Sequence, residues 1–212
     1  MIECPSCGRR QEPRLACETC GAPLGTELDC FAALGLQRKL VIDSAALERA
    51  YHDLSRRIHP DRFAQSSAGV RDASLRSTAL LTRGYRTLRD PIARGLYWLE
   101  LRGEKLAENN KIVPPDLAEL VFEVQDELSE LREAPGASFA KLRERTMARR
   151  AELEESLNAL HADLEKNFKG WDAGVAPEAQ LAKELKAILS KIAYLRTLIR
   201  DVDRELEKPK AA

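Results

Sequence analysis

Five cysteines lie near the N-terminus, and four of them form two matching pairs. Cys4-Pro-Ser-Cys7-Gly and Cys17-Glu-Thr-Cys20-Gly each place two sulfur atoms three residues apart at a tight turn, where the glycine permits a left-handed residue. Four thiolates in this arrangement predict one tetrahedral zinc ion with Zn–S bonds of ~2.3 Å. An iron site of the rubredoxin kind and a redox dithiol pair are the alternatives. Cys30 lies in an apolar stretch and is expected to be a buried small hydrophobic residue.

The segment that carries these pairs cannot form a core by itself. Residues 1–27 have little periodic apolar pattern, whereas residues 28–98 and 99–212 have apolar stripes of their own. A structural zinc ion can supply ~10–16 kcal/mol of apparent binding free energy. We therefore expect the metal to organise this segment and to stabilise it alone.

A second group of residues suited to chemistry is the tripeptide His59-Pro60-Asp61. It follows the basic pair Arg56-Arg57 and precedes Arg62. Taken alone, the tripeptide fits an acid–base pair, half of a metal site or an ordinary loop. Elsewhere the sequence has no nucleophile elbow or catalytic triad and no glycine-rich phosphate loop. We expect that the chain is not an enzyme.

Helices must position these groups. Capping residues, apolar spacing and breakers predict a short apolar turn within 28–36 and helices near residues 43–58, 67–88 and 92–101. Three longer helices are expected near 116–133, 138–169 and 177–207, and their short connections favour an antiparallel bundle. In the last helix the predicted core stripe is Leu181, Leu185, Ile188, Ile192, Leu195, Ile199, Val202 and Leu206.

Composition supports an all-α fold. Aromatic residues are only 5% of the 212 residues, and charged residues are 32%. Low aromatic content with many Ala, Leu, Glu, Arg and Lys favours helices over strands. No apolar run is long enough to span a membrane, and acidic residues interrupt the N-terminus, so we expect a cytoplasmic location. The 34 basic and 34 acidic residues cancel, which argues against a protein that mainly neutralises phosphates.

The middle of the chain resembles the J domain of DnaJ-type co-chaperones. The matching motifs are Leu54-Ser-Arg-Arg-Ile-His-Pro-Asp-Arg-Phe63 and Tyr85-Arg-Thr-Leu-Arg-Asp-Pro91. The resemblance implies that the tripeptide loop and the basic helix before it dock on a DnaK-class ATPase and stimulate ATP hydrolysis, with Arg56, Arg57 and Arg62 beside the loop. Residues 28–98 contain 12 Lys+Arg against 7 Asp+Glu, a charge that suits an acidic partner.

From residue 28 onward the chain is similar to the HscB family of co-chaperones of iron–sulfur cluster assembly. The similarity extends over residues 29–36, 88–103 and 123–128. It implies a tetracysteine zinc segment at 1–27, a J domain at 28–103 and a client-binding three-helix bundle at 104–212. It also implies two partners, an HscA-type chaperone and the scaffold protein IscU. The chain departs from the family pattern at Thr82, Gly84, Ala118 and Glu119.

The bundle offers a candidate binding face that periodicity and the resemblance both indicate. The predicted core stripe of helix 116–133 is Leu117, Leu120, Val121, Val124, Leu128 and Leu131, and Phe122 lies roughly 150° from its middle. Tyr194 lies roughly 130° from the predicted stripe of the last helix. Phe122, Glu123, Asp126 and Tyr194 align with the scaffold-contact positions of the family. The helix has seven acidic residues and one basic residue, so it suits a basic partner.

Two other functions remain open on the residues alone. One is a J-domain co-chaperone with a different client, because Ala118 and Glu119 replace apolar residues of the client-binding helix. The other is a zinc-ribbon protein that binds nucleic acid through its basic helices, with the bundle serving dimerisation. The neutral total charge counts against the second.

Overall fold

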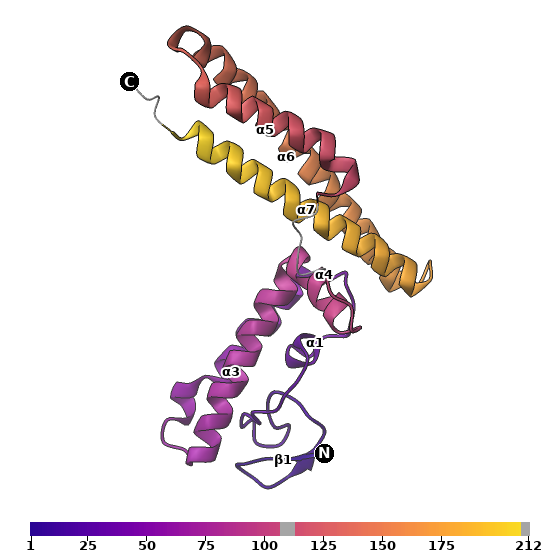
Figure 1. Cartoon of the computed structure of the whole chain (residues 1–212). Coiled ribbons are helices and arrows are strands. Elements are labelled where there is room, and N and C mark those ends of the chain that lie inside the picture. The colour runs from indigo at the N-terminus through magenta and orange to yellow at the C-terminus, as the bar shows by residue number, and fades with distance from the viewer. Residues whose placement is uncertain (107–112, 209–212) are drawn as a thin grey trace. The chain divides into compact units, whose positions relative to one another are not determined.

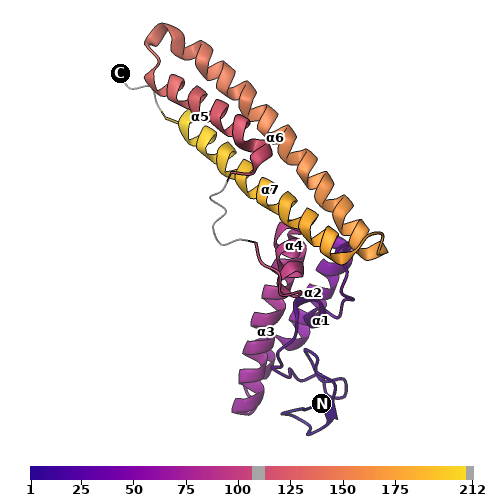
Figure 2. The ribbon, with the colours of Figure 1, turned by 45° about the vertical axis from the view of Figure 1, so that its right-hand side comes forward.

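The computed structural model describes residues 1–106 and 113–208 (Figures 1 and 2). The chain divides into two compact units, Met1–Trp98 and Leu99–Ala212. The predicted all-α fold is confirmed, since the only strands of the described residues are the two-residue β1 (Ile2–Glu3) and β2 (Arg10–Gln11). Part of the expected linker after residue 103 lies outside the described residues. Among the residues described, no helix is both long and apolar enough to cross a membrane.

The first unit is a helical hairpin with shorter helices at its ends. Its elements are α1 (Cys30–Ala33), α2 (Ser44–Ile58), the 3-10 turn η1 (Pro60–Phe63), α3 (Ala68–Arg89) and α4 (Pro91–Glu100). The helix starts predicted from the sequence are found in the structure, because capping side chains bond to the first backbone N–H groups of these helices. The Asp43 carboxylate accepts from the N–H groups of Ala45 and Ala46, and the Asp90 carboxylate accepts from those of Ile92 and Ala93.

The helices of this hairpin close on a core of large apolar side chains. Phe31, Leu47, Ile58, Leu81 and Leu88 are all buried. Tyr51 of α2 stacks on Tyr85 of α3, with ring centroids 4.2 Å apart. These side chains lie on the faces that the helical spacing predicts.

Gly84 has a packing reason that the sequence did not reveal. It is buried in α3, and a Cβ placed there would lie 3.2 Å from the carbonyl oxygen of Cys30. The side-chain-free position therefore lets α1 approach α3 closely, and this contact offsets the ~1 kcal/mol that glycine costs inside a helix. Cys30 itself is buried, as expected.

The cysteine segment belongs to the first unit as well. Leu15, Ala22 and Leu24 are buried, and the N–H of Gly25 donates to Ser77 Oγ of α3 at 3.1 Å. The expectation that a metal stabilises residues 1–27 alone stays a prediction, and the packing of this segment on α3 is the observation that argues against it. Sequence periodicity missed this contact because the segment buries its few apolar residues against a helix far along the chain.

The second unit is an antiparallel three-helix bundle. The 3-10 turn η2 (Pro115–Leu117) leads into α5 (Ala118–Glu133), which is followed by α6 (Gly136–Ala173) and α7 (Glu178–Leu206). Gly174 ends α6 in the left-handed conformation, with φ 61°. The bundle core where all three helices meet consists of Val124, Leu128, Leu153, Leu195, Leu198 and Val202.

The buried face of α7 rotates along the helix, and this changes the predicted core. Leu189 and Leu198 are buried, whereas Ile188 and Ile199 of the predicted stripe are only half-buried. At 1.5 Å per residue, α5 is about 24 Å long and α7 about 44 Å long. The first half of α7 therefore packs mainly on α6, and its second half packs on both α6 and α5 (Figures 1 and 2).

Candidate metal centre and docking surfaces

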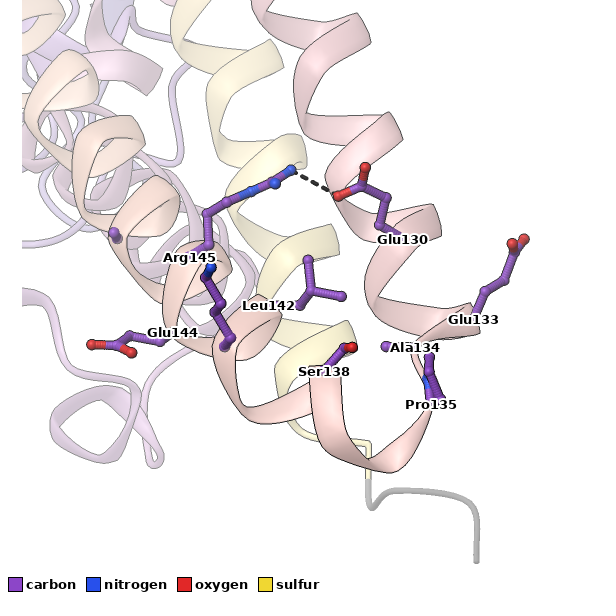
Figure 3. A pocket seen from close by; sticks show the side chains of 10 residues that line it. Glu130, Glu133, Ala134, Pro135, Ser138, Leu142, Glu144 and Arg145 are labelled. Atoms are coloured by element: carbon purple, nitrogen blue, oxygen red, sulfur yellow. Dashed lines mark hydrogen bonds and ion pairs between the residues drawn. The ribbon is translucent and has the colours of Figure 1, made fainter.

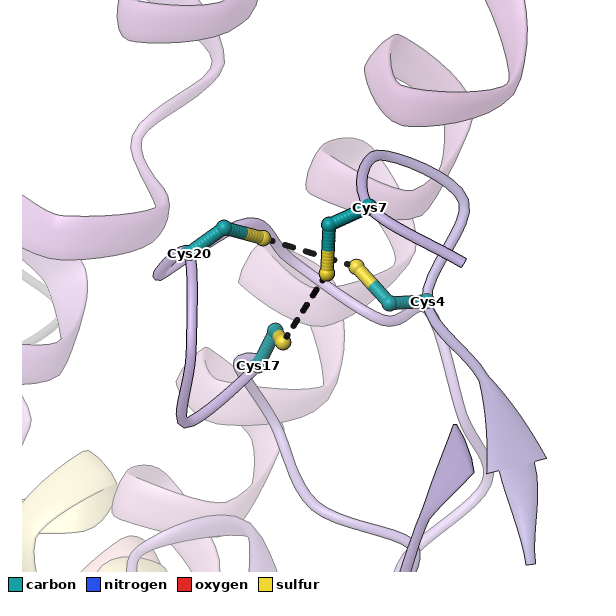
Figure 4. Close-up of side chains that lie close together, drawn as sticks. All are labelled: Cys4, Cys7, Cys17 and Cys20. Carbon is teal, nitrogen blue, oxygen red and sulfur yellow. Dashed lines mark hydrogen bonds between the residues drawn. The ribbon is translucent and has the colours of Figure 1, made fainter. Parts of the chain in front are cut away.

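The four predicted metal ligands converge on one point (Figure 4). Each of Cys4, Cys7, Cys17 and Cys20 contributes a sulfur atom, and all four sulfur atoms lie within 4.8 Å of one another. The Sγ–Sγ distance is 3.6 Å for Cys4 and Cys20 and 3.8 Å for Cys7 and Cys17. A tetrahedral ion with Zn–S bonds of ~2.3 Å places its sulfur ligands about 3.8 Å apart. The cluster therefore has the dimensions of a tetrahedral thiolate site and could hold a metal ion.

Two backbone loops of the same design present these sulfur atoms. In each loop the backbone carbonyl of the first cysteine accepts a hydrogen bond from the N–H of the glycine four residues later. The backbone N–H of the same cysteine donates to the carbonyl five residues later. The glycines, Gly8 and Gly21, have φ of 71° and 72°, a conformation that disfavours residues with a Cβ. The pairing of β1 with β2 flanks the first loop, and the Ala16–Pro23 bridge flanks the second. This repeated design explains why the spacing of the cysteines predicted the cluster.

The electrostatics of the cluster favour a bound cation. The N–H of Cys20 lowers the pKa of the Cys17 thiol to about 6. The N–H of Arg9 also lowers the pKa of Cys7, but contacts with the other thiols and burial outweigh it and raise that pKa to about 11. Thiols this close to one another cannot all lose their protons without a compensating positive charge. A divalent cation supplies that charge.

The His59-Pro60-Asp61 tripeptide forms an exposed turn directly after α2. His59 caps η1, and its Nδ1 accepts from the N–H of Asp61 at 3.3 Å. The side chains of His59 and Asp61 are 51% and 91% exposed. Asp61 Oδ2 lies 3.5 Å from His59 Nδ1, but neither side chain is buried, so the pair lacks the dry surroundings of a catalytic acid–base pair. The geometry suits a recognition loop.

The predicted basic residues flank this turn in the sequence. Arg56, Arg57 and Arg62 are exposed. Arg56 forms an ion pair with Asp53 one turn earlier, and the Arg62 guanidinium donates to the Arg56 carbonyl at 3.4 Å. Arg56 and Arg62 thus lie together beside the tripeptide, with part of the charge of Arg56 neutralised locally, whereas Arg57 lines a pocket with Leu15 and Ala33.

The four predicted client-contact residues divide into two kinds. Phe122 is 74% exposed and Asp126, one turn later on α5, is exposed as well. Glu123 pairs with Arg149 of α6 at 3.4 Å. Tyr194 is half-buried and packs against the bundle core. The outward face of α5 is therefore formed by Phe122 and Asp126, and the other two residues are engaged within the bundle.

The expectation that the Tyr194 ring points away from the core is wrong. Its angle was measured from a single straight stripe, but the buried face of α7 rotates where α5 joins the bundle. In this half of α7, Leu198, Val202 and Glu205 are buried, and Tyr194 lies roughly 50° from their mean direction. The ring consequently contributes to packing.

The acidic face of α5 is largely neutralised by the bundle itself. Glu127 is buried and accepts two hydrogen bonds from Arg149, at 2.8 and 3.2 Å. Glu130 accepts from Arg145 at 2.9 Å. Within residues 1–106 and 113–208, Glu119 and Asp126 make no ion pair. Two exposed carboxylates that remain available to a partner, those of Glu119 and Asp126, therefore lie next to Phe122.

An open groove lies at the hairpin between α5 and α6 (Figure 3). Its volume is about 920 Å³, and its walls include Glu133, Pro135, Leu142 and the Glu130–Arg145 ion pair. It contains none of the residues predicted to contact a client, because Phe122, Glu123 and Asp126 lie nearer the start of α5 and Tyr194 lies on α7. The groove and the predicted face are thus separate features of the bundle.

The sequence interpretation missed two kinds of residue that support these sites. Ser74 and Ser77 are completely buried in α3, and each donates a hydrogen bond to a distant backbone carbonyl. Two serines three residues apart on an apolar helix face indicate buried hydroxyl groups that need hydrogen-bond partners from other segments. Glu127 occupies a core position of α5, and its partner could have been sought among the arginines of α6.

Comparison with known proteins supports the resemblance that the motifs indicated. No family model matches the chain. The chain is 47% identical over 75 residues to the "Co-chaperone protein HscB homolog" of Aromatoleum aromaticum, covering 35% of this chain and 42% of that protein. It is 31% identical over 129 residues to the "Iron-sulfur cluster co-chaperone protein HscB homolog" of Arabidopsis thaliana, covering 60% and 51%. The matched segments thus span about half the length of these curated relatives.

Solved structures agree with this assignment. The chaperone HscB from Vibrio cholerae is 22% identical, with a TM-score of 0.61, and covers 84% of this chain and 99% of its own. The human co-chaperone HscB is 24% identical, with a TM-score of 0.64, and covers 95% and 97%. At these identities the likeness establishes the fold. The curated relatives and the structural neighbours carry the HscB name, so the resemblance predicted from the sequence is confirmed.

Proposed function

We propose that the protein is an HscB-type co-chaperone that docks on an HscA-type ATPase, stimulates ATP hydrolysis and delivers an IscU-type iron–sulfur scaffold. The observation that carries the proposal is the exposed His59-Pro60-Asp61 turn at the end of the basic helix α2. Such a surface suits an acidic partner through steering and charge complementarity. The relatives are co-chaperones by name, which agrees with the expectation that the chain has no catalytic activity of its own. A cytoplasmic location stays a prediction.

Chaperone stimulation is tested with the purified full chain and an HscA-type ATPase. The wild-type chain should raise the rate of ATP hydrolysis, and His59→Gln should abolish the increase without changing the thermal melt. His52→Gln is the matched control, because His52 is an exposed histidine of α2, the helix that precedes the turn, and it pairs with Glu48 of that helix at 3.8 Å. Stimulation by His59→Gln equal to that by the wild type would refute the role of the turn.

Delivery of the scaffold is assigned to the outward face of α5. Phe122 supplies an exposed aromatic ring, and Glu119 and Asp126 supply exposed carboxylates at spacings of three and four residues from it. An aromatic anchor with an acidic rim fits a partner patch that is apolar at its centre and basic at its edge. Calorimetric titration with the scaffold protein tests this assignment.

A J-domain co-chaperone for a different client is the second candidate. Ala118 and Glu119, which replace apolar residues of the family pattern, are exposed on the same side of α5 as Phe122. Their exposure reduces the apolar area of the face and makes it more acidic. Chaperone stimulation without measurable scaffold binding would favour this candidate.

The proposed metal is one structural zinc ion held by Cys4, Cys7, Cys17 and Cys20. The ion would cross-link the two loops and neutralise their thiolates. The four-sulfur set leaves no open coordination position, so a structural role fits better than a catalytic one. Metal analysis of the purified chain should find one zinc per chain, and iron or a disulfide would refute the assignment.

A further inference from the structure

Two buried serines in α3 connect the cysteine cluster to the His59-Pro60-Asp61 turn. Ser77 Oγ accepts from the N–H of Gly25 at 3.1 Å and donates to the carbonyl of Leu15 at 3.3 Å. One turn earlier, Ser74 Oγ donates to the carbonyl of Ile58 at 2.6 Å. Ile58 is the last residue of α2 and directly precedes His59.

The contact at Ser77 depends on the metal-binding loops. Leu15 lies two residues before the ligand Cys17, and its carbonyl also accepts from the N–H of Leu24 at 3.1 Å. The small core under these loops consists of Cys4, Cys17, Ala22 and Leu24. Such a core is too small to hold the loops without a cross-link, so the position of Leu15 relative to α3 depends on the thiolate site.

The loops also fit α3 closely. Gly25 has φ of 60°, and a Cβ placed there would lie 2.9 Å from Cα of Ala73. Ala73, Ser74 and Ser77 are all almost completely buried. Close packing of this kind transmits a change of position instead of absorbing it, because protein interiors have few voids.

We infer that the α3 turn between Ser74 and Ser77 links the two sites, so that metal binding at the cysteine cluster holds the His59-Pro60-Asp61 turn in its docking conformation. Ser74 and Ser77 are positioning residues in this scheme, since neither contacts the chaperone or the metal. The significance of the turn for docking rests on the proposed function. The structural link itself does not.

The link requires that the coupling act in both directions. If the bound metal raises the affinity of the chain for the chaperone, the chaperone must raise the affinity of the chain for the metal by the same factor. The cysteine segment then regulates docking without lying on the docking surface.

The first test measures amide hydrogen exchange by NMR on the full chain, with zinc bound and after zinc is removed by a chelator. The reporter is the N–H of Arg62, which donates to the carbonyl of His59 at 3.0 Å. Removing zinc should accelerate its exchange about tenfold, the factor for one buried hydrogen bond, while amides in the bundle stay unchanged. Unchanged exchange at Arg62 would overturn the inference. Acceleration at Arg62 no greater than that of the core amides of α2 and α3 would do so too, because a lower stability of the whole first unit would then account for it.

The second test separates the serine path from metal binding. Ser77→Ala with zinc bound should accelerate exchange at Arg62 while one zinc ion is retained. Thr78→Val is the matched control, because the neighbouring Thr78 Oγ1 is buried and makes no hydrogen bond with any described residue, so its loss should leave exchange at Arg62 unchanged. Acceleration by Thr78→Val equal to that by Ser77→Ala would refute a specific path. Neither exchange measurement contains the chaperone. A failure to stimulate the chaperone would therefore refute the proposed function, whereas the link between the metal site and the turn would still be decided by the exchange rates at Arg62.

Discussion

Replacing Phe122 with alanine separates binding from folding on α5. The ring is 74% exposed, so only about a quarter of it is buried. Full burial of a phenylalanine contributes ~1.5–3 kcal/mol, and the truncation therefore removes ~0.5 kcal/mol of stability. The melting temperature should fall by about 2 °C or less. If Phe122 is the central anchor of the client face, scaffold binding loses ~2 kcal/mol or more, which weakens the Kd about 30-fold.

The control substitution lies on the same helix but faces the core. Leu128 is completely buried among Leu153, Leu195 and Val202. Truncating a buried leucine to alanine costs ~2–5 kcal/mol, because it removes contacts and leaves a cavity. Leu128→Ala should therefore lower the melting temperature of the bundle by about 10 °C. Differential scanning calorimetry measures this effect, and isothermal titration with the scaffold measures binding.

Two results would contradict the reasoning. If Phe122→Ala destabilised the bundle as much as Leu128→Ala, the ring would be part of the core. If Phe122→Ala changed neither the melt nor scaffold binding, the client would not use this face of α5. Tyr194→Ala gives an intermediate case: because its ring packs against the core, we expect ~1–2 kcal/mol of lost stability beside any loss of binding.

Three further changes test the metal and the buried charges. Cys7→Ser should lose the metal and lower the melting temperature of the whole first unit, because the cysteine loops pack on α3; a melt unchanged outside residues 1–27 would contradict this. Arg149→Ala should cost ~3–5 kcal/mol of unfolding free energy, measured in urea, since it leaves the buried Glu127 without its main partner; a loss below ~1 kcal/mol would show that the pair is not needed. Burial would raise the pKa of Glu205, but Arg132 and Lys208 outweigh it and hold that pKa below the usual 4.5, so its contribution to stability is present above pH 4.5 and lost as the pH falls below that value. Urea unfolding between pH 7 and about 3 should therefore show a smaller acid destabilisation for Glu205→Gln than for the wild type, and identical curves would refute the pairing.

The sequence by itself determined most of the local structure. Asp43, Pro60 and Asp90 set helix ends that the structure reproduces, because caps and breakers act through neighbouring backbone groups. The two cysteine loops were equally readable, since four ligands and two glycines at fixed spacing define the cluster geometry with little help from the rest of the chain.

Only the tertiary structure decided how distant segments share a surface. The rotation of the buried face of α7 depends on where the shorter α5 packs, which periodicity within α7 cannot show, and this reversed the orientation expected for Tyr194. The docking of Leu15 and Gly25 on Ser77 joins residues more than 50 positions apart through one hydroxyl group. Helical periodicity shows which side of a helix is apolar. Which other element packs on that side, and which group bonds to a hydroxyl buried there, is fixed only when the helices pack together.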